Sequence, residues 1–537
     1  MTTETISQPE SRTPHKPRGS GGAAALVASG ILASRLLGVV RQSLMARYLG
    51  ATTGIAADAF MAAFKIPNLL QNLFGEGALS ASFIPVYSNL LARNEREEAG
   101  RVAGAVAAIL ALVTAGLVLL GVWLAPLLIP VIAPGFSGDK RDLTITLTRI
   151  LFPGAGVFVL SAWCLGVLNS HRRFFLSYAA PVLWNVAMIG ALLGFGGRQD
   201  RIHLAITLGW ASVAGAAFQF LVQLPVVLRL IPGLRLSLDY TRANVRKVLA
   251  NFTPVFFSRG IVQVSAYVDQ LLASLLPQGM VALLGYAVTI YTLPVSLFGM
   301  SISAAELPEM SSVLGDESQI ATMLRERLNV GLRRIAFFVI PSAAAFLVLG
   351  DVIARALFQS GRFNETDTVF TWGILAGSAV GLLASTLGRL YSSTYYALHD
   401  TRTPLRFAIV RVTLTTVLGY LFAIPLPGLL GIDQRWGAAG LTASAGIAGW
   451  IEFLLLRSRL NRRIGVTGLP KKYVAVLWIS AAVAAGSALA LRRGFATTQR
   501  FLFAGIVLGT FALVYGAMTL LLRIPEARAL LARVSRR

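Results

Sequence analysis

Long apolar runs separated by short polar breaks recur along the chain, and this pattern limits what the chain can fold into. A helix rises about 1.5 Å per residue, so about 20 residues cross a hydrocarbon core of about 30 Å. Fourteen runs reach this length, and only 13% of the residues are charged, about half the share in an ordinary soluble domain. The sequence therefore predicts an all-α polytopic membrane protein with 14 transmembrane helices. The runs are 22–49, 57–90, 102–126, 143–168, 176–196, 202–228, 248–276, 280–311, 331–350, 366–398, 404–424, 436–456, 473–491 and 501–522.

The basic residues are distributed unequally between the two sides of these spans. Of the 48 Lys and Arg residues, 30 lie on the side of the N-terminus and 10 on the opposite side. The positive-inside rule then places both termini in the cytoplasm. Membrane topology and contact with anionic lipids explain the net charge of +24, so nucleic acid is not expected as a partner.

Residue patterns typical of enzymes are missing from the sequence. It contains no phosphate-binding glycine loop, no zinc-protease helix motif and no nucleophile elbow. The single cysteine, Cys164, lies inside a predicted span, and the four histidines lack the spacing of metal ligands. We therefore expect no enzyme, no cofactor and no metal site, and a function in binding or transport.

The two halves of the chain are weakly similar to each other. Three segments match at offsets between 223 and 227 residues: 33–50 with 257–274, 65–70 with 292–297, and 80–88 with 303–311. Internal repeats are characteristic of transporters, with the substrate site between the repeats. We predict a disordered cytoplasmic tail (1–21), two six-helix lobes (22–235 and 236–460), and two extra helices with a basic cytoplasmic tail (461–537).

Two arginines lie deep in the first predicted span. An arginine near the bilayer centre costs about 3 kcal/mol on insertion scales, so it is expected to face a cavity or a partner rather than lipid. Arg35 and Arg41 flank Gly38, where a kink could turn both side chains toward one cavity. Arg47, near the end of the span, is expected to reach the interface.

Charged residues also recur in the second and later spans. Asp58, Lys65 and Glu76 lie within about 40° of one another on an ideal helix. They could form one wall of a polar cavity, or a set of static salt bridges that joins the first two spans. In the second lobe, Asp269 either neutralises Arg259 or binds a cation. Because basic residues outnumber acidic ones in the spans, the cavity is predicted to favour an anion such as phosphate or carboxylate. A further basic residue, Arg389, either lines the cavity or reaches the interface.

With these features in place, the sequence resembles the MurJ (MviN) family of lipid II flippases, in the multidrug/oligosaccharidyl-lipid/polysaccharide exporter superfamily. The resemblance covers nearly the whole chain, including the predicted 14 spans and two lobes. The matching segments are SRLLGVVRQSLMARYLG (34–50), DAFMAAFKIPNLLQNLFGEGALSASFIPV (58–86), APGF (133–136) and YALHDTRTP (396–404).

The resemblance implies a multi-pass protein of the bacterial cytoplasmic (inner) membrane that acts in peptidoglycan biosynthesis. Its expected partners are lipid II, membrane lipids and other cell-wall synthesis proteins. The head group of lipid II would cross a cationic cavity by alternating access while its tail stays in the membrane beside the two extra helices. By position, Arg35 and Arg41 match arginines of that cavity, Asp58 matches an important aspartate, and Glu76 matches the glutamate of a family turn.

The sequence also departs from the family pattern. Gln71 and Thr289 stand where the family commonly has basic residues, so we hypothesise that Arg259 supplies part of the lost charge. Coupling to the membrane potential, a proton gradient or a monovalent cation stays open; Asp269 is available for a cation, although span 11 has no carboxylate. Two other functions also stay open, export of another polyprenyl-linked glycan or a drug, and a scaffold that does not transport. The predicted substrate-binding residues are Arg35, Arg41, Asp58, Lys65, Glu76, Arg259 and Arg389.

Overall fold

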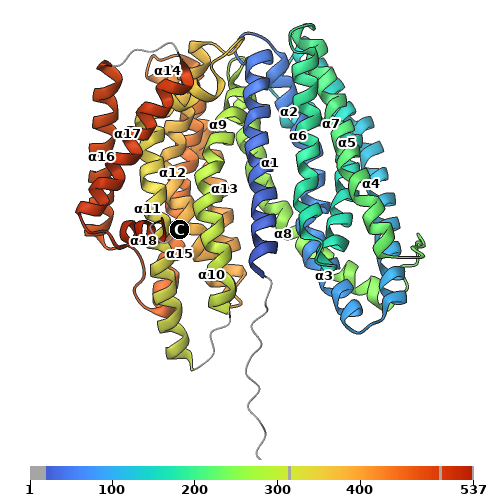
Figure 1. The fold of residues 1–537 in the computed structure, drawn as a ribbon. Helices are drawn as coiled ribbons and strands as arrows, with labels where there is room; N and C mark the ends of the chain where they lie inside the picture. The colour runs from blue at the N-terminus through green and yellow to red at the C-terminus, as the bar shows by residue number, and fades with distance from the viewer. Residues whose placement is uncertain (1–19, 312–315, 495–498, 535–537) are drawn as a thin grey trace, which may run out of the picture.

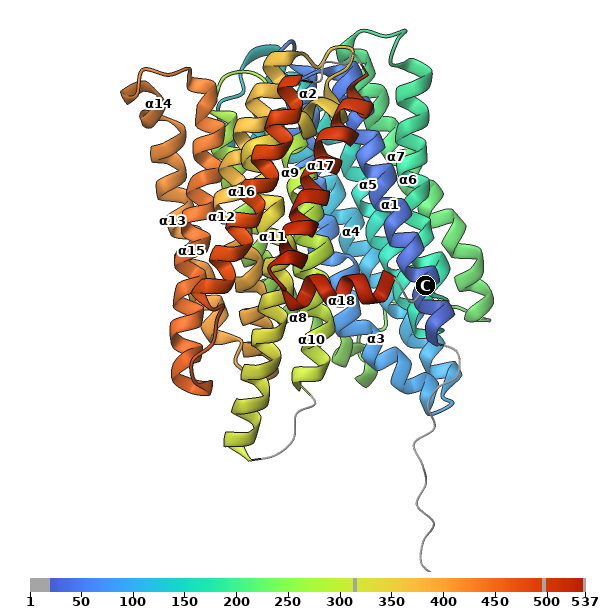
Figure 2. The same ribbon diagram turned by 60° about the vertical axis from the view of Figure 1, so that its left-hand side comes forward.

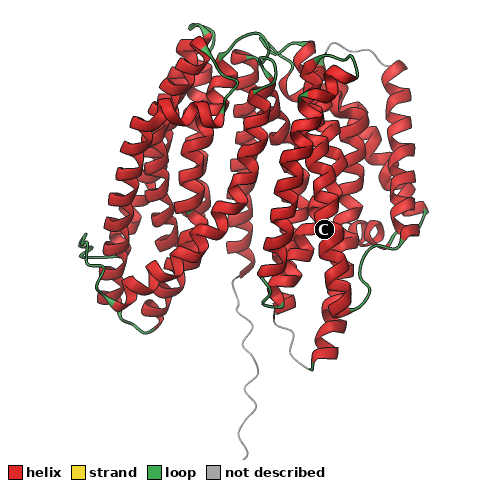
Figure 3. Ribbon diagram, turned by 180° about the vertical axis from the view of Figure 1, so that it is seen from behind, coloured by secondary structure: helices red, strands yellow, loops and turns green. Residues whose placement is uncertain are grey.

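The computed structural model describes residues 20–311, 316–494 and 499–534, which form helices and their connections (Figure 3). The all-helical fold predicted from the sequence is thereby confirmed. Most of the tail predicted over 1–21 lies outside the described residues. Also outside the description are the side chains of residues 20–29, 31, 76–77, 255, 257–266, 308 and 533–534.

The first half of the chain forms helices α1–α7, which stand side by side in Figure 1 (blue to green). Within a membrane every backbone N–H and C=O has to be paired inside the protein, which favours unbroken helices for these apolar runs. The helices are α1 (Ser20–Leu49), α2 (Ala56–Phe74), α3 (Glu76–Ala92), α4 (Arg96–Ile132), α5 (Gly138–Ser170), α6 (Phe174–Phe195) and α7 (Arg201–Leu230).

The second half forms the remaining helices, and the short α18 runs across the others in Figure 2. A π-helical turn (η1) and a 3-10 turn (η2) interrupt the series. The elements are α8 (Ala243–Ser274), α9 (Met280–Pro294), η1 (Val295–Met300), α10 (Ser301–Ser311), α11 (Glu317–Phe358), α12 (Glu365–Ala397), α13 (Arg402–Ala423), α14 (Pro425–Leu429), η2 (Gln434–Trp436), α15 (Gly437–Ile464), α16 (Lys471–Gly494), α17 (Arg500–Leu521) and α18 (Pro525–Val534).

Within the described part of the chain, 11 helical segments are long and apolar enough to cross a membrane. The chain is therefore a multi-pass membrane protein. All the predicted runs fall on helices, but 22–49, 57–90 and 248–276 are not among these 11 segments. The count of 14 spans and the division into two six-helix lobes stay predictions.

Two of the predicted spans are interrupted. The run 57–90 is divided between α2 and α3 at Gly75, which leaves helical geometry at φ −82° and ψ −149°. A Cβ at Gly75 would overlap the carbonyl oxygen of Gln71, so the break needs glycine. The run 280–311 passes into η1 directly after Pro294, whose ring nitrogen donates no hydrogen bond.

The buried apolar residues form one large core and smaller ones. The largest cluster draws on both halves of the chain, from Met45 in α1 to Ala527 in α18. A second cluster joins α3, α4 and α5 to the start of α8, and includes Phe83, Val102 and Val248. Helices of the two halves therefore share apolar contacts as well as the covalent linker.

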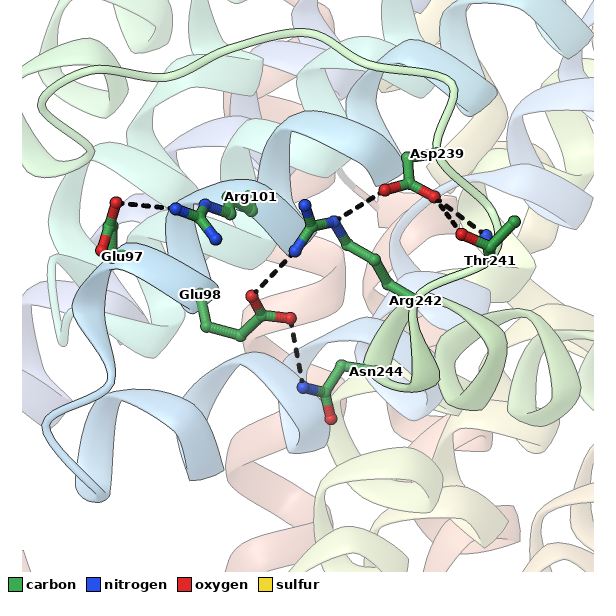
Figure 4. A network of polar contacts seen from close by, with 7 residues as sticks. All are labelled: Glu97, Glu98, Arg101, Asp239, Thr241, Arg242 and Asn244. Carbon is green, nitrogen blue, oxygen red and sulfur yellow. Dashed lines mark hydrogen bonds and ion pairs between the residues drawn. The ribbon is translucent and has the colours of Figure 1, made fainter.

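The linker between α7 and α8 is fixed to α4 (Figure 4). Arg242 forms ion pairs with Glu98 of α4 at 3.2 Å and with Asp239 of the linker at 2.9 Å. Gly104 allows the linker backbone to lie against α4. Any other residue at this position would have a Cβ that overlaps the carbonyl oxygen of Arg235. The chain therefore enters its second half from a point held against α4.

Candidate functional site

A polar cavity lies among helices of the first half and α9. Its volume is about 1250 Å³, and residues of α1, α2, α3, α5, α6, α7 and α9 line it. Within the described part of the chain, Arg35 and Arg41 are the only charged residues that line it. Both charged side chains that face the cavity are thus cations.

Helix α1 presents both arginines without a break. The helix is continuous from Ser20 to Leu49, and Gly38 lines the cavity between the two arginines. A Cβ at Gly38 would meet nothing within 4 Å, so this glycine leaves room in the cavity. Arg35 is exposed and Arg41 is half-buried, so the side chain of Arg41 is the more enclosed of the two.

Arg41 is held by an aromatic ring. Its Cζ lies 4.2 Å from the centroid of the Trp184 ring of α6, a cation–π geometry. Its Nε is buried and has no hydrogen-bond partner, and no ion pair of Arg41 is found among the described residues. The charge of Arg41 is therefore ordered but not compensated.

Uncharged polar side chains make up much of the remaining wall. Buried amide oxygens of Gln42 and Asn185 have no hydrogen-bond partner. Gln71 and Thr289, where the family commonly has basic residues, both line the cavity as neutral side chains. This wall offers hydrogen-bond donors and acceptors to a polar, uncharged group. The lining carboxamides are those of Gln42, Asn68, Gln71, Asn72, Asn185 and Gln219.

Asp58 lies away from the cavity, although it was predicted beside the arginines. Its side chain is buried, and Oδ2 forms an ion pair with Lys140 of α5 at 2.5 Å. Oδ2 also accepts a hydrogen bond from the backbone N–H of Gly279 at 2.7 Å, and Oδ1 accepts one from Ala282 at 2.8 Å. Asp58 thus caps the N-terminus of α9 with a carboxylate from α2. The partner of Asp58 in the structure is thus Lys140, and not an arginine of the cavity.

More hydrogen bonds join the two halves at this same end, the upper end in Figure 1. Thr52 donates from its backbone N–H and its hydroxyl to Asp367 of α12, at 3.1 and 2.5 Å. The Tyr286 hydroxyl donates to the carbonyl of Gly50 at 3.2 Å, and the Gln278 amide donates to the carbonyl of Thr52 at 3.2 Å. These bonds close the end of the molecule away from the start of α1.

The other predicted site residues are dispersed. Lys65 does not line the cavity, and its carbonyl accepts a hydrogen bond from Tyr267 at 2.8 Å. Asp269 has a buried Oδ1 without a partner, and no metal-binding group of three or more His, Cys, Asp or Glu is found in the described part. Arg389 is exposed and also lies outside the cavity lining. The predictions for the side chains of Glu76 and Arg259 concern positions whose side chains are outside the description.

Sequence reasoning missed Lys140 and Trp184. Lys140 lies in the polar segment GDKRD (138–142), where nothing local links it to a residue of α2. Trp184 follows Pro181 and precedes Asn185 in an otherwise apolar run. An aromatic and a polar residue together inside a span was the available signal for a cavity wall.

Comparison with known proteins shows similarity along nearly the whole chain. The sequence profile of the family described as "Lipid II flippase MurJ" matches residues 45–510. A probable lipid II flippase MurJ from Rhizobium tropici is 33% identical over 478 residues, covering 86% of this chain and 85% of the relative. The lipid II flippase MurJ of Burkholderia cenocepacia is 32% identical over 449 residues, covering 82% of this chain and 84% of the relative.

Solved structures are similar in fold. A structure described as lipid II flippase MurJ in an inward closed conformation has a TM-score of 0.77 at 24% identity and covers 93% of this chain and 99% of its own. An inward-facing multidrug resistance MATE transporter of the MOP superfamily has a TM-score of 0.61 at 17% identity, covering 82% of this chain and 98% of its own. At these identities the structures establish a shared fold.

Proposed function

The chain belongs to the lipid II flippase MurJ family, and from this premise we propose that it flips lipid II across the bacterial cytoplasmic membrane. The head group is a disaccharide-pentapeptide linked through pyrophosphate to an undecaprenyl tail. It passes through the cavity from the inner to the outer leaflet. The observation that carries this proposal is a cavity lined, among the described residues, by two arginines and no acid.

The charge of the cavity suits the pyrophosphate. A pyrophosphate diester has one negative charge on each phosphate, and guanidinium groups bind phosphate oxygens through paired N–H bonds. Arg35 and Arg41 supply two positive charges. With no carboxylate among the described lining residues, the cavity offers no negative charge to a cationic drug, which argues against the drug-export alternative.

The neutral part of the wall suits the rest of the head group. Sugar hydroxyls and peptide amides both donate and accept hydrogen bonds, as carboxamides do. Gln42 and Asn185 each hold a buried acceptor that has no partner among the described residues. The undecaprenyl tail stays in lipid, beside α16 and α17, because transfer of an apolar chain from lipid into a polar cavity is unfavourable.

Transport proceeds by alternating access. The hydrogen bonds that Asp58 accepts and that Thr52 and Tyr286 donate close the end opposite the start of α1, which supports an inward-open state if the N-terminus is cytoplasmic. Each such bond contributes about 1–3 kcal/mol net, with the larger values for bonds that a carboxylate accepts, so a few of them can be exchanged for contacts in an outward-open state. Substrate binding shifts the balance between the two states.

Exposure of lipid II on the outer leaflet tests the proposal, in cells depleted of their own flippase and expressing this protein. The Arg35→Ala/Arg41→Ala variant removes both cavity charges and should reduce exposure to the background level. Each arginine is expected to account for about a tenfold change or more. Arg149→Ala is the matched control, because Arg149 lies in α5 but does not line the cavity.

The outcomes separate the open functions. If the double variant exposes as much lipid II as wild type, at equal abundance in the membrane, the role of the two arginines in transport is contradicted. Folded wild-type protein that exposes no lipid II would contradict the flippase proposal, in favour of another polyprenyl-linked glycan or a scaffold. Loss of exposure in Arg149→Ala as well would mean that the measurement reports general damage.

A further inference from the structure

The guanidinium of Arg41 rests on a ring rather than on a carboxylate. The Cζ of Arg41 lies 4.2 Å from the centroid of the Trp184 ring. A buried arginine is commonly paired with an acid, because an isolated buried charge is costly. Here no acid of the described structure forms an ion pair with Arg41, and the buried Nε of Arg41 has no partner among the described residues.

The Trp184 ring is itself held on several sides. Its indole N–H donates to Ser212 Oγ of α7 at 3.0 Å. Phe64 stacks with the ring at a centroid distance of 5.8 Å, and Phe158 meets it edge-on at 5.9 Å. A Cβ at Gly215 would lie 2.8 Å from Trp184 Cδ1, so α7 packs tightly against this side chain. The ring is therefore a fixed platform.

Such a platform solves a physical conflict in an anion-binding cavity. A carboxylate would order the arginine but would cancel the charge that attracts the ligand. An aromatic face attracts the cation through its quadrupole and leaves the net charge unchanged. We propose that Trp184 is a positioning residue that holds the Arg41 guanidinium ordered and uncompensated for the phosphate groups of the substrate. This inference rests on the proposed function and adds a specific determinant of substrate affinity.

The two cavity arginines then differ in how they are prepared for binding. Arg35 is exposed and has no aromatic ring against it among the described contacts. Arg41 is half-buried and already fixed, so it loses less conformational freedom when a ligand binds. The contribution of Trp184 should therefore be expressed through Arg41 alone.

The test is a binding titration of lipid II to the purified protein in detergent, with five variants: Trp184→Leu, Trp184→Phe, Arg41→Ala, Arg41→Ala/Trp184→Leu and Trp210→Leu. Trp184→Leu removes the aromatic face and should weaken binding about threefold to thirtyfold. Trp184→Phe restores an aromatic face and should recover much of that loss. In the Arg41→Ala background, Trp184→Leu should cause no further loss, because the interaction that it removes is already absent. Trp210→Leu is the control, an exposed tryptophan of α7 outside the cavity, and should bind as wild type.

A structural role for Trp184 gives a different result. Equal losses from Trp184→Leu with and without Arg41 would overturn the inference, as would unchanged binding in Trp184→Leu. If Trp184→Leu does not fold, Ser212→Ala loosens the ring by removing its hydrogen bond and should weaken binding severalfold only when Arg41 is present. If wild type does not bind lipid II, the proposed function fails, and the same series with inorganic pyrophosphate tests the positioning role by itself.

Discussion

At the scale of single residues, Asp58 combines three interactions in one buried carboxylate. It pairs with Lys140 of α5 and accepts the backbone N–H groups of Gly279 and Ala282 at the start of α9. A helix N-terminus leaves such N–H groups without partners inside the helix, so an acid from another helix is a suitable cap. The residue therefore joins α2 and α5 to an element of the other half of the chain.

Replacement of Asp58 by asparagine should destabilise the protein. The side chain of Lys140 is only 14% exposed, and without its partner it becomes an uncompensated charge. We expect Asp58→Asn to lower the free energy of unfolding by about 3 kcal/mol, seen as a lower unfolding temperature in detergent. Adding Lys140→Met should recover part of the loss, and Asp142→Asn, at an exposed acid of α5, should have little effect. Equal stability of Asp58→Asn and wild type would refute the pairing.

At the scale of elements, the close approach of the linker to α4 depends on small residues. Gly100 and Gly104 lie one turn apart on α4, against Ile231 and the carbonyl of Arg235. The ion pairs of Arg242 with Glu98 and Asp239 then fix the far end of the linker (Figure 4). The two glycines permit the close approach of the linker to α4, and the ion pairs fix the position of the linker along the helix.

A bulky side chain at Gly104 should lift the linker from α4. We expect Gly104→Leu to cost about 1–3 kcal/mol of stability and to speed trypsin cleavage after Arg235. The matched control is Gly116→Leu, on the same helix, where a Cβ would meet nothing within 4 Å. Unchanged cleavage in Gly104→Leu, with normal folding, would show that the linker does not depend on this contact.

At the scale of the whole molecule, the two halves are joined at one end by bonds that alternating access has to break. The backbone of Thr52, between α1 and α2, meets both Asp367 of α12 and Gln278 before α9. The polar cavity is lined in part by α1, α2 and α9, the helices that these contacts adjoin. Opening the far end therefore requires this set of contacts to separate as a group, while the linker on α4 keeps the halves connected.

A covalent bridge across the closed end should stop transport without stopping binding. Thr52→Cys/Gln278→Cys, joined by a bis-methanethiosulfonate cross-linker that forms a disulfide with each cysteine and releases sulfinate, should lose lipid II exposure and regain it when a reductant cleaves the bridge. Thr53→Cys/Arg201→Cys is the control, because these residues are hydrogen-bonded within the first half. Cys164 is buried, so background reaction should be small. Full transport by the bridged protein would contradict opening at this end.

The sequence by itself determined that this protein forms membrane-spanning helices and that two arginines in the first span face a polar space. Apolar run length specifies membrane-spanning helices, because lipid leaves backbone groups no partner except within the protein. The same argument predicted that Arg35 and Arg41 would face a polar space, and both line the cavity. Their role in binding stays a prediction, as do the span count and the lobe division. The helical fold and the polar surroundings of the two arginines could be predicted because they depend on local composition and on the cost of burying charge.

Only the tertiary structure decided which residues meet. Asp58 lies in the same span as Lys65, yet its partners are Lys140 and the start of α9, 82 and more than 200 residues away. Nothing in the sequence links Trp184 to Arg41, and only the packing of α6 against α1 brings the Trp184 ring against the Arg41 guanidinium. Helical periodicity gives the direction of a side chain on its own helix, but it does not give the neighbour of that helix or its rotation. Pairing across helices is set by the packing of the whole bundle, and for that reason it cannot be read from any one segment.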